Sequence, residues 1–509
     1  MFKPILLWTD AALFLLLACV LAYAWHAARS ATLRAAWAQV SRSAPAMCSA
    51  VVLLVMAAIG LLDSLHYQPR LPPVPGAPAD APAVYAPAVR SALDGLLDAT
   101  VLTRTEKTYS APLAWRQFTK ETLLVDGQPA SAGPSQAGDP PRGDGAQRQG
   151  GAVIRDFPRL RHGGAYLTDP GAQWLPDLRM RLGWGLAGGA LAALLAGALL
   201  GAVLARRHGG WRAAVSALCR GRTDLPWRPV FCTVAALCLL VGAVAGLASG
   251  YHVLGTDRTG NDVLWQSLKS VRTALVIGSL TTAAMLPPAI FFGIASGYFK
   301  GRVDDAIQYL YTTITAIPGV LLVAACALMM QVYIDRHASL FNTSAARADL
   351  RLFLLCMILG LTGWAGLCRL LRAETLKLRE LDYVQAARAF GISHWRIMRR
   401  HLLPNVMHLV LITVVLEFSG LVLYEAVLSY LGIGVDPSMN SFGAMIDGAR
   451  LEMSRDPMIW WNLFAAFVFM LALVLAANLF ADAVREAFDP RLRRRKAGKP
   501  VAADAGALP

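Results

Sequence analysis

Two carboxylates stand inside an apolar stretch of the chain, where an ionisable group is costly. Glu417 and Glu425 are the only Asp, Glu, Lys or Arg residues in 406–430. A charge at the centre of a bilayer costs at least about 2.5–3.5 kcal/mol unless it faces water or a partner. Glu417 follows Asn405 by 12 residues, or about 18 Å of helix, which places it near mid-membrane. Glu417 is therefore predicted either to line a cavity or to be protonated and hydrogen-bonded to a neighbouring helix.

Motifs for enzyme chemistry are absent from the 509 residues. There is no G-x-x-x-x-G-K-[S/T] phosphate loop and no H-E-x-x-H pair. His401 and His408 are seven residues apart, a spacing more typical of one helix face than of a ligand pair. We expect no catalytic residue and no metal site. The net charge of +15 does not indicate nucleic acid, because the basic residues lie between apolar runs.

A polar segment, residues 382–404, separates two of these apolar runs. It reads as a helix, a hinge and a second helix. Gly391 is placed to end the first helix in a left-handed turn, Ser393 to cap the second, and Pro404 to break the chain before the next apolar run. Four residues at i, i+3, i+4 and i+7 form one apolar stripe that would attract a protein partner: Tyr383, Ala386, Ala387 and Phe390.

The elements that position these residues are long apolar helices. Hydrophobic residues make up 56% of the chain and charged residues only 16%, against about 25% charged in soluble domains. About 20 apolar residues cross a bilayer as a helix. The fold class is therefore all-α, a polytopic membrane bundle, with nine predicted spans at 5–25, 46–62, 182–205, 230–249, 273–297, 306–331, 351–371, 406–430 and 458–480.

Basic residues predict the orientation of the spans. Residues 26–45, 206–229, 369–404 and the tail after 481 are rich in Arg and Lys, and these are alternate loops. Such loops are cytoplasmic. The C-terminus is thus expected in the cytoplasm and the N-terminus outside.

The long segment 63–181 then falls outside. Gly127–Gly151 is of low complexity and is expected to be disordered, whereas Thr105–Val125 could hold short strands or a small packed element. Residues 250–272 read as a short amphipathic element on the outer surface. Prolines inside two spans, Pro287–Pro288 and Pro318, predict kinks.

The polar segment resembles the coupling-loop signature of binding-protein-dependent ABC importer permeases. That signature is EAA, three residues, Gly, nine residues, then I-x-L-P. Here it reads Gln385-Ala386-Ala387, Gly391 and His401-Leu402-Leu403-Pro404. Gln385 replaces the first Glu and removes its charge, and His401 replaces the Ile. The coupling loop is assigned to residues 372–404.

Further segments resemble the oligopeptide and dipeptide permeases of this class, in their C-type subunit, and they occur in the order of that family. They are Leu254–Leu264 (LGTDRTGNDVL), Tyr424–Gly432 (YEAVLSYLG), Ser441–Met445 (SFGAM) and Asp482–Arg491 (DAVREAFDPR). Residues 108–114 and 157–167 look like an extended subgroup of the same permeases. The resemblance covers 227–495 and leaves three spans and the outer loop as additions.

The domain boundaries follow from this resemblance and the spans. They are two transmembrane helices at 1–62, the periplasmic loop 63–181, an extra span with an Arg-rich cytoplasmic loop at 182–229, the permease core 230–488 and a basic tail 489–509. The resemblance implies that the chain lies in the bacterial inner membrane and forms half of a pore for di- or oligopeptides. Glu417 would meet a peptide amine, and Glu425 would close an outer gate.

The implied partners are a homologous permease, two cytoplasmic ATPase subunits, a periplasmic solute-binding protein and membrane lipid. ATP and Mg²⁺ would bind the ATPases, and this chain would bind no cofactor. The residues implied to contact the ATPase are Tyr383, Gln385, Ala386, Ala387, Phe390, Gly391, His401, Leu403 and Pro404.

Two alternatives stay open. The same class of transporter also handles nickel, opines and peptide antibiotics, although no Met/His-rich outer cluster suggests a soft metal. A membrane-embedded sensor or enzyme is the other alternative, but no motif supports it.

Overall fold

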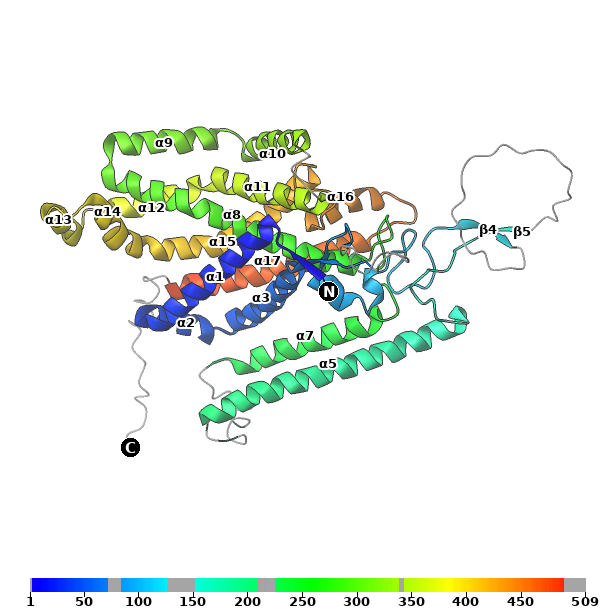
Figure 1. The fold of residues 1–509 in the computed structure, drawn as a ribbon. Coiled ribbons are helices and arrows are strands. Elements are labelled where there is room, and N and C mark those ends of the chain that lie inside the picture. Colours follow the sequence, from blue (N-terminus) through cyan, green and yellow to red (C-terminus); the bar gives the residue numbers. More distant parts are fainter. Residues whose placement is uncertain are drawn as a thin grey trace, which may run out of the picture.

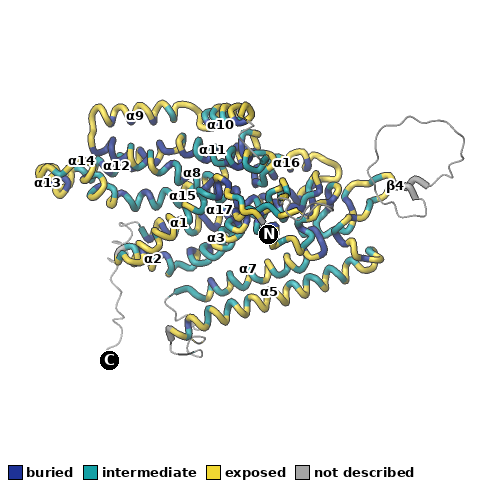
Figure 2. The backbone as a smooth tube through the Cα atoms, viewed as in Figure 1, coloured by how far each residue is buried: buried dark blue, intermediate teal, exposed yellow. Residues whose placement is uncertain are grey.

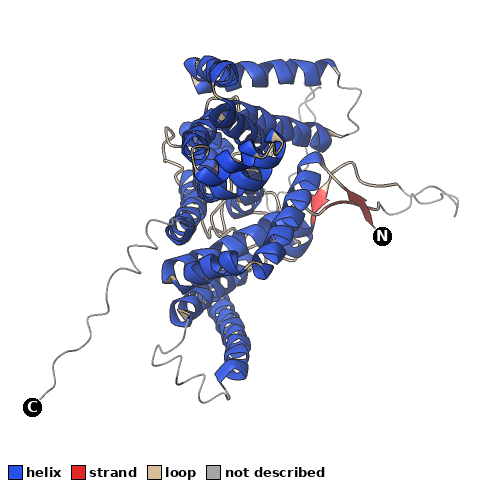
Figure 3. Cartoon of the chain, turned by 90° about the vertical axis from the view of Figure 1, so that its left-hand side faces the viewer, coloured by secondary structure: helices blue, strands red, loops and turns tan. Residues whose placement is uncertain are grey.

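The computed structural model describes residues 2–71, 84–125, 152–208, 225–337 and 343–488, with the single residues 210 and 216. The stretch Gly127–Gly151 and the tail 489–509 lie outside the described residues. Nine helices in the described part are long and apolar enough to cross a membrane. The predicted fold class, an all-α membrane bundle, is confirmed, and the strands of the described residues are short (Figures 1 and 3).

The bundle is built around one central helix, α8 (Val263–Phe299). It packs against α3 (Ala44–Asp63), α11 (Ser344–Gly363) and α12 (Ala365–Leu378) on different sides. Two further helices complete the packing around it, α15 (Leu403–Tyr430) and α17 (Trp461–Phe488). Figure 2 shows that the buried residues concentrate along these helices.

The start of α8 corrects one prediction. The prediction of a separate amphipathic element at 250–272 is wrong, because the residues from Val263 onward form the first turns of α8 itself. The side chain of Asp262 caps that helix by accepting from the Trp265 N–H at 3.0 Å. The helix then runs unbroken through Pro287 and Pro288.

The predicted span 306–331 is two helices rather than one. α9 (Gly301–Ala316) ends before Ile317, and α10 (Gly319–Arg336) begins after Pro318. A residue that precedes proline is pushed out of the helical region, and Ile317 is extended with φ −85° and ψ 132°. Only α10 is a candidate span.

The N-terminal helices pack onto the core. α1 (Trp8–Arg29) contacts α8 and α11, and α2 (Ala31–Arg42) and α3 contact α17. The strand β1 (Phe2–Ile5) pairs with β2 (His66–Pro69), which pairs with β3 (Arg90–Ser91). The N-terminus and the start of the long segment 63–181 therefore lie on the same side of the bundle, as predicted.

A helical hairpin lies at the edge of this body and contacts it at α3 (Figure 1). It consists of α5 (Pro170–His208), which begins 12 residues before the predicted span, and α7 (Trp227–Ala248). The two helices touch at glycines: a Cβ added to Gly185 would lie 2.4 Å from the Gly242 carbonyl oxygen. Larger side chains would separate the backbones, which is how small residues promote close helix packing in membranes.

The bundle has two distinct ends (Figure 1). At one end, called here the α13 end, lie α2, α13 (Asp382–Ala389), α14 (His394–Ile397) and the last turns of α17, which pack against α2. At the opposite end, the α16 end, lie α16 (Phe442–Glu452) and the paired strands β4 (Glu121–Val125) and β5 (Ala152–Asp156). The remaining short helix, α4 (Ala92–Leu97), belongs to the same 63–181 segment. The described parts of the loops that were predicted to lie on one side of the membrane thus lie at the same end of the bundle.

Candidate functional site

The helix α13 of the coupling loop ends as predicted. Gly391 adopts φ +71°, a conformation that costs other residues about 1–2 kcal/mol. The Ile392 N–H donates to the Ala387 carbonyl at 3.1 Å, and the Gly391 N–H donates to the Arg388 carbonyl at 3.0 Å. This pair of bonds is the glycine-dependent helix ending, and it sets the angle at which the chain turns toward α14.

The apolar residues of α13 divide between two faces, which corrects the predicted single stripe. Val384 is fully buried and Ala387 is 6% exposed, and both belong to the core cluster that includes Leu371 and Leu402. Phe390, in contrast, is 84% exposed, and Tyr383 (43%) and Ala386 are also exposed. One face therefore anchors α13 to its own chain, and the other presents an aromatic ring to the exterior.

Polar contacts hold the exposed side of α13. The Asn405 side-chain amide donates to the Tyr383 hydroxyl at 3.1 Å, and the Tyr383 ring lies 6.1 Å from that of His401. Gln385 donates to the Glu380 carbonyl at 3.1 Å. Gln385, in the position of the family's first Glu, is thus exposed and bonded within its own chain.

Pro404 does not break the chain, so that prediction is wrong. α14 continues through a π-helical turn, Met398–Leu402, directly into α15. Pro404 stands in the first turn of α15, where a missing N–H is tolerated, and π turns accommodate such local changes of register. Leu403 is half-buried and Pro404 exposed. The Ser393 side chain makes no cap; its backbone carbonyl accepts from the Ile397 N–H.

The coupling loop is tied to the end of α8. The Tyr298 hydroxyl contacts His394 Nδ1 at 2.8 Å, and Arg379 donates to the Tyr298 carbonyl at 2.7 Å. Arg372 makes a two-pronged ion pair with Asp304 of α9, with both N–O distances 2.7 Å. The residues on both flanks of α13 are therefore bonded to α8 and α9.

The two predicted acids of α15 lie in different surroundings. Glu425 is buried, and the Ser429 hydroxyl donates to its Oε1 at 2.7 Å. Glu417 is exposed on the surface of this chain, alongside the exposed Leu416 and Leu423. The two side chains are therefore not brought together, and their pore and gate roles stay predictions.

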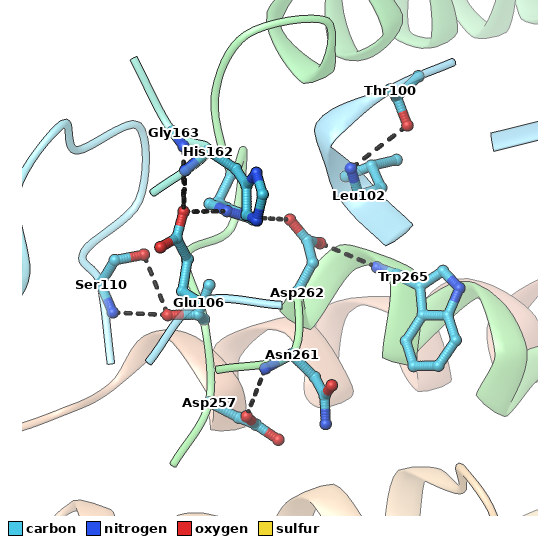
Figure 4. A network of polar contacts seen from close by, with 12 residues as sticks. Thr100, Leu102, Glu106, Ser110, His162, Gly163, Asp257, Asn261, Asp262 and Trp265 are labelled. Atoms are coloured by element: carbon cyan, nitrogen blue, oxygen red, sulfur yellow. Dashed lines mark hydrogen bonds and ion pairs between the residues drawn. The ribbon is translucent and has the colours of Figure 1, made fainter. Parts of the chain in front are cut away.

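A buried ionic network at the α16 end was not anticipated from the sequence (Figure 4). His252 is fully buried between Asp262, at 2.8 Å from Nδ1, and Glu106, at 3.4 Å from Nε2. Glu106 also accepts from the backbone N–H groups of 161–163. The network joins the segment 63–181 to the loop before α8. The only signal in the sequence was that Glu106 and His252 adjoin the matched segments 108–114 and 254–264.

In this network, hydrogen bonds together shift the pKa values of Glu106 and His252 more than burial does. Burial opposes charge on both groups, yet the hydrogen bonds from His252 and the three backbone N–H groups lower the pKa of Glu106 to about 2. Hydrogen bonds to Asp262 and Glu106, with their negative charges, raise the pKa of His252 to about 9. His252 is therefore an imidazolium held between two carboxylates.

The raised pKa of His252 predicts a loss of stability in alkali. Its contribution is complete below the unfolded pKa near 6.5 and disappears as pH rises through about 9. We expect the α16 end to lose of the order of 2–3 kcal/mol between pH 6.5 and 9.5, measured as faster amide hydrogen exchange in residues 106–113 after correction for intrinsic rates. The same measurement on His252→Gln is the control. Equal pH slopes in both proteins would contradict the assignment.

A second unanticipated cluster joins the N-terminal helices to the core. Arg272 of α8 is 3% exposed and bonds to Asp10 at 2.6 Å, to Thr9 at 2.9 Å and to Ser64 at 3.1 Å. Asp349 of α11 accepts from the Thr9 N–H at 3.0 Å. Charged residues at the edges of apolar spans were the available signal. Among the described residues, no group of three or more His, Cys, Asp or Glu side chains is placed to hold a metal.

Comparison with known proteins identifies the core. The family described as "Binding-protein-dependent transport system inner membrane component" matches residues 289–494, which include the coupling loop from 372 to 404. The residues that anchor α13, from Tyr298 to Asn405, therefore all lie in the matched region.

Individual relatives match about half of the chain. The oligopeptide transport system permease protein OppC of Haemophilus influenzae is 30% identical over 251 residues, 49% of this chain and 74% of the relative. The dipeptide permease DppC of Bacillus subtilis is 28% identical over 48% of this chain and 71% of its own length. The glutathione permease GsiD of Pectobacterium atrosepticum is 30% identical over 48% of this chain and 74% of its own length. The chain thus belongs to the binding-protein-dependent transport system inner membrane components, the permease subunits of ATP-binding-cassette importers.

Proposed function

We propose that this chain forms half of the translocation pore of an importer for di- and oligopeptides. A homologous permease would supply the other half, two cytoplasmic ATPases the energy, and a periplasmic binding protein the solute. The observation that carries the proposal is the division of α13, with Val384 and Ala387 in the core and Phe390 presented outward. The relatives are named as oligopeptide, dipeptide and glutathione permeases, and these names favour peptides as the solute.

The mechanism follows from how α13 is anchored. Its exposed face, with Phe390 and Tyr383, would seat in a cleft of an ATPase that binds ATP and Mg²⁺, while this chain binds no nucleotide. Its buried face and the Tyr298–His394 and Arg372–Asp304 contacts would pass the motion to α8, α9 and α15. ATP binds the closed ATPases more tightly, which biases the helices between inward- and outward-facing states.

The orientation belongs to the same proposal. The α13 end would face the cytoplasm, since the basic loops 26–45 and 369–404 lie there and basic loops stay inside. The α16 end and the segment 63–181 would then meet the periplasmic binding protein. The N-terminus would be periplasmic and the C-terminus cytoplasmic.

An uncovered strip of α15 is where we place the pore. Five residues along one face of this helix are exposed in this chain: Leu416, Glu417, Gly420, Leu423 and Val427. The second permease would stand opposite this strip, and the solute would pass between them. Glu417 would then supply a negative charge to the passage at mid-membrane, where it attracts a cationic amine.

Uptake by the assembled complex tests both the solute and this role. In vesicles containing both permeases, the ATPases and the receptor, we expect ATP-dependent uptake of labelled peptides, with Ni²⁺ and an opine not taken up. Glu417→Gln is expected to reduce uptake of a lysine-containing peptide about tenfold, because one ion pair in a low-dielectric passage is lost. Uptake of a neutral peptide should change less than twofold.

The exposed Asp305 of α9 offers a matched carboxylate outside the strip, so Asp305→Asn should leave both peptides unaffected. Equal uptake of the two peptides by Glu417→Gln would remove Glu417 from recognition. Uptake of nickel or an opine in place of peptides would overturn the assigned solute but not the transporter class.

A further inference from the structure

Two adjoining hollows meet at Trp395, at the α13 end of the bundle. One is an apolar groove of about 250 Å³ between α8 and the start of the α14–α15 helix. The other, of about 600 Å³, is basic. Both are lined by Trp395 and Arg399, so the two hollows adjoin and are treated as one site with an apolar and a cationic part. It lies beside the predicted ATPase-contacting face of α13, and of the residues implied to contact the ATPase its lining includes Leu403 and Pro404.

The apolar part runs along a membrane-spanning helix. Pro287, Ile290, Phe291 and Ile294 of α8 form one wall, and Met398 and Leu403 line the opposite side. Phe291 is 52% exposed. Because these α8 residues lie within a candidate span, a soluble protein could not reach along them, whereas a lipid acyl chain could.

The basic part lies on α14 and on the π-helical turn that follows it. Arg396, Arg399 and Arg400 line it, and all three are exposed. No ion pair joins any of them to an acid in the described part of the chain, and the residues that line the two hollows include no Asp or Glu. Arginines at i, i+3 and i+4 share one helix face, so three guanidinium groups surround one space. Such a group of donors suits a phosphate.

The exposed Trp395 marks where the two parts meet. It is 60% exposed and lines both hollows. Tryptophan is enriched at the level of lipid headgroups, where one edge of the ring is apolar and the other is wet. Basic pockets between helices on the cytoplasmic side of membrane proteins bind anionic headgroups.

We propose that this site binds one anionic phospholipid of the inner leaflet. Its phosphate would contact Arg396, Arg399 and Arg400, and an acyl chain would lie in the groove along Pro287–Ile294. The site includes part of the π-helical turn Met398–Leu402, which connects the coupling loop to α15. A bound lipid would therefore brace the turn through which α13 and α15 are linked.

Lipid retention by the purified complex tests this inference. The complex would be prepared in detergent with equal amounts of phosphatidylglycerol and phosphatidylcholine, and bound lipids counted by native mass spectrometry. Each arginine near an anionic lipid contributes about fivefold in affinity. We expect the wild type to prefer phosphatidylglycerol at least tenfold, and the double variant Arg396→Gln/Arg399→Gln, which keeps only Arg400, to fall to a preference of about fivefold or less.

The matched control is Arg302→Gln, which removes an exposed arginine of α9 outside the site and should retain phosphatidylglycerol. Inorganic phosphate at millimolar concentration should not displace the lipid, since it lacks the acyl chain. Equal retention of both lipids by the wild type, or equal loss in the control, would overturn the proposal. The proposal would also be overturned if the double variant kept its lipid but lost the ATPases, because the arginines would then be an ATPase contact.

Discussion

Phe390→Ala is expected to reduce ATP-dependent uptake at least tenfold while the protein remains folded and inserted. The ring is 84% exposed, and removing a side chain at such a position changes the free energy of unfolding by less than about 0.5 kcal/mol. If the ring fills a pocket on an ATPase, its loss costs about 2 kcal/mol or more of binding. The measurements are uptake, the amount of ATPase that co-purifies, and the thermal unfolding midpoint of the permease.

A second exposed aromatic residue provides the control for Phe390. Tyr309 on α9 is 76% exposed and lies outside the coupling loop, so Tyr309→Ala should retain uptake and bound ATPase. Unchanged uptake and ATPase content in Phe390→Ala would show that the exposed face of α13 is not the contact. A lowered unfolding midpoint would instead indicate that the ring stabilises its own chain.

Arg272→Met is expected to destabilise the protein by about 3–5 kcal/mol. Removing one member of a buried ion pair leaves an uncompensated charge, which is the costly case. Arg272 is 3% exposed, and its partner Asp10, 2.6 Å away, is fully buried. The predicted readout is a large fall in the thermal unfolding midpoint, together with protease access to the N-terminal helices α1 and α3.

Two further variants isolate the ion pair. In the double variant Arg272→Met/Asp10→Asn the leftover charge is removed, so its loss of stability should be smaller than the sum of the single losses. Arg351→Met breaks a looser pair, 3.4 Å from Asp436, and should cost about 1 kcal/mol or less. Additive losses at Arg272 and Asp10 would mean that the two residues act independently.

Much of the architecture could be predicted because membrane insertion depends on local sequence. The length and hydrophobicity of each apolar run decide whether it spans a bilayer, and eight of the nine predicted spans overlap helices that remain whole or continue into neighbouring helices. The ninth, 306–331, is divided by the backbone restriction at Ile317–Pro318. Gly391 was predictable for the same local reason, since a helix ending of this kind depends on one residue's φ angle.

Contacts between distant residues could not be predicted in the same way. Glu106 and His252 are 146 residues apart, and Asp10 and Arg272 are 262 apart; neither pair shares a periodicity that a single sequence reveals. The same holds for α13, where spacing alone made Ala387 part of the outward stripe. Its burial depends on Leu371 and Leu402, which arrive from α12 and from the π-helical turn. Hydropathy decides which segments enter the membrane, but which face of a helix is covered depends on the neighbours that the fold brings to it.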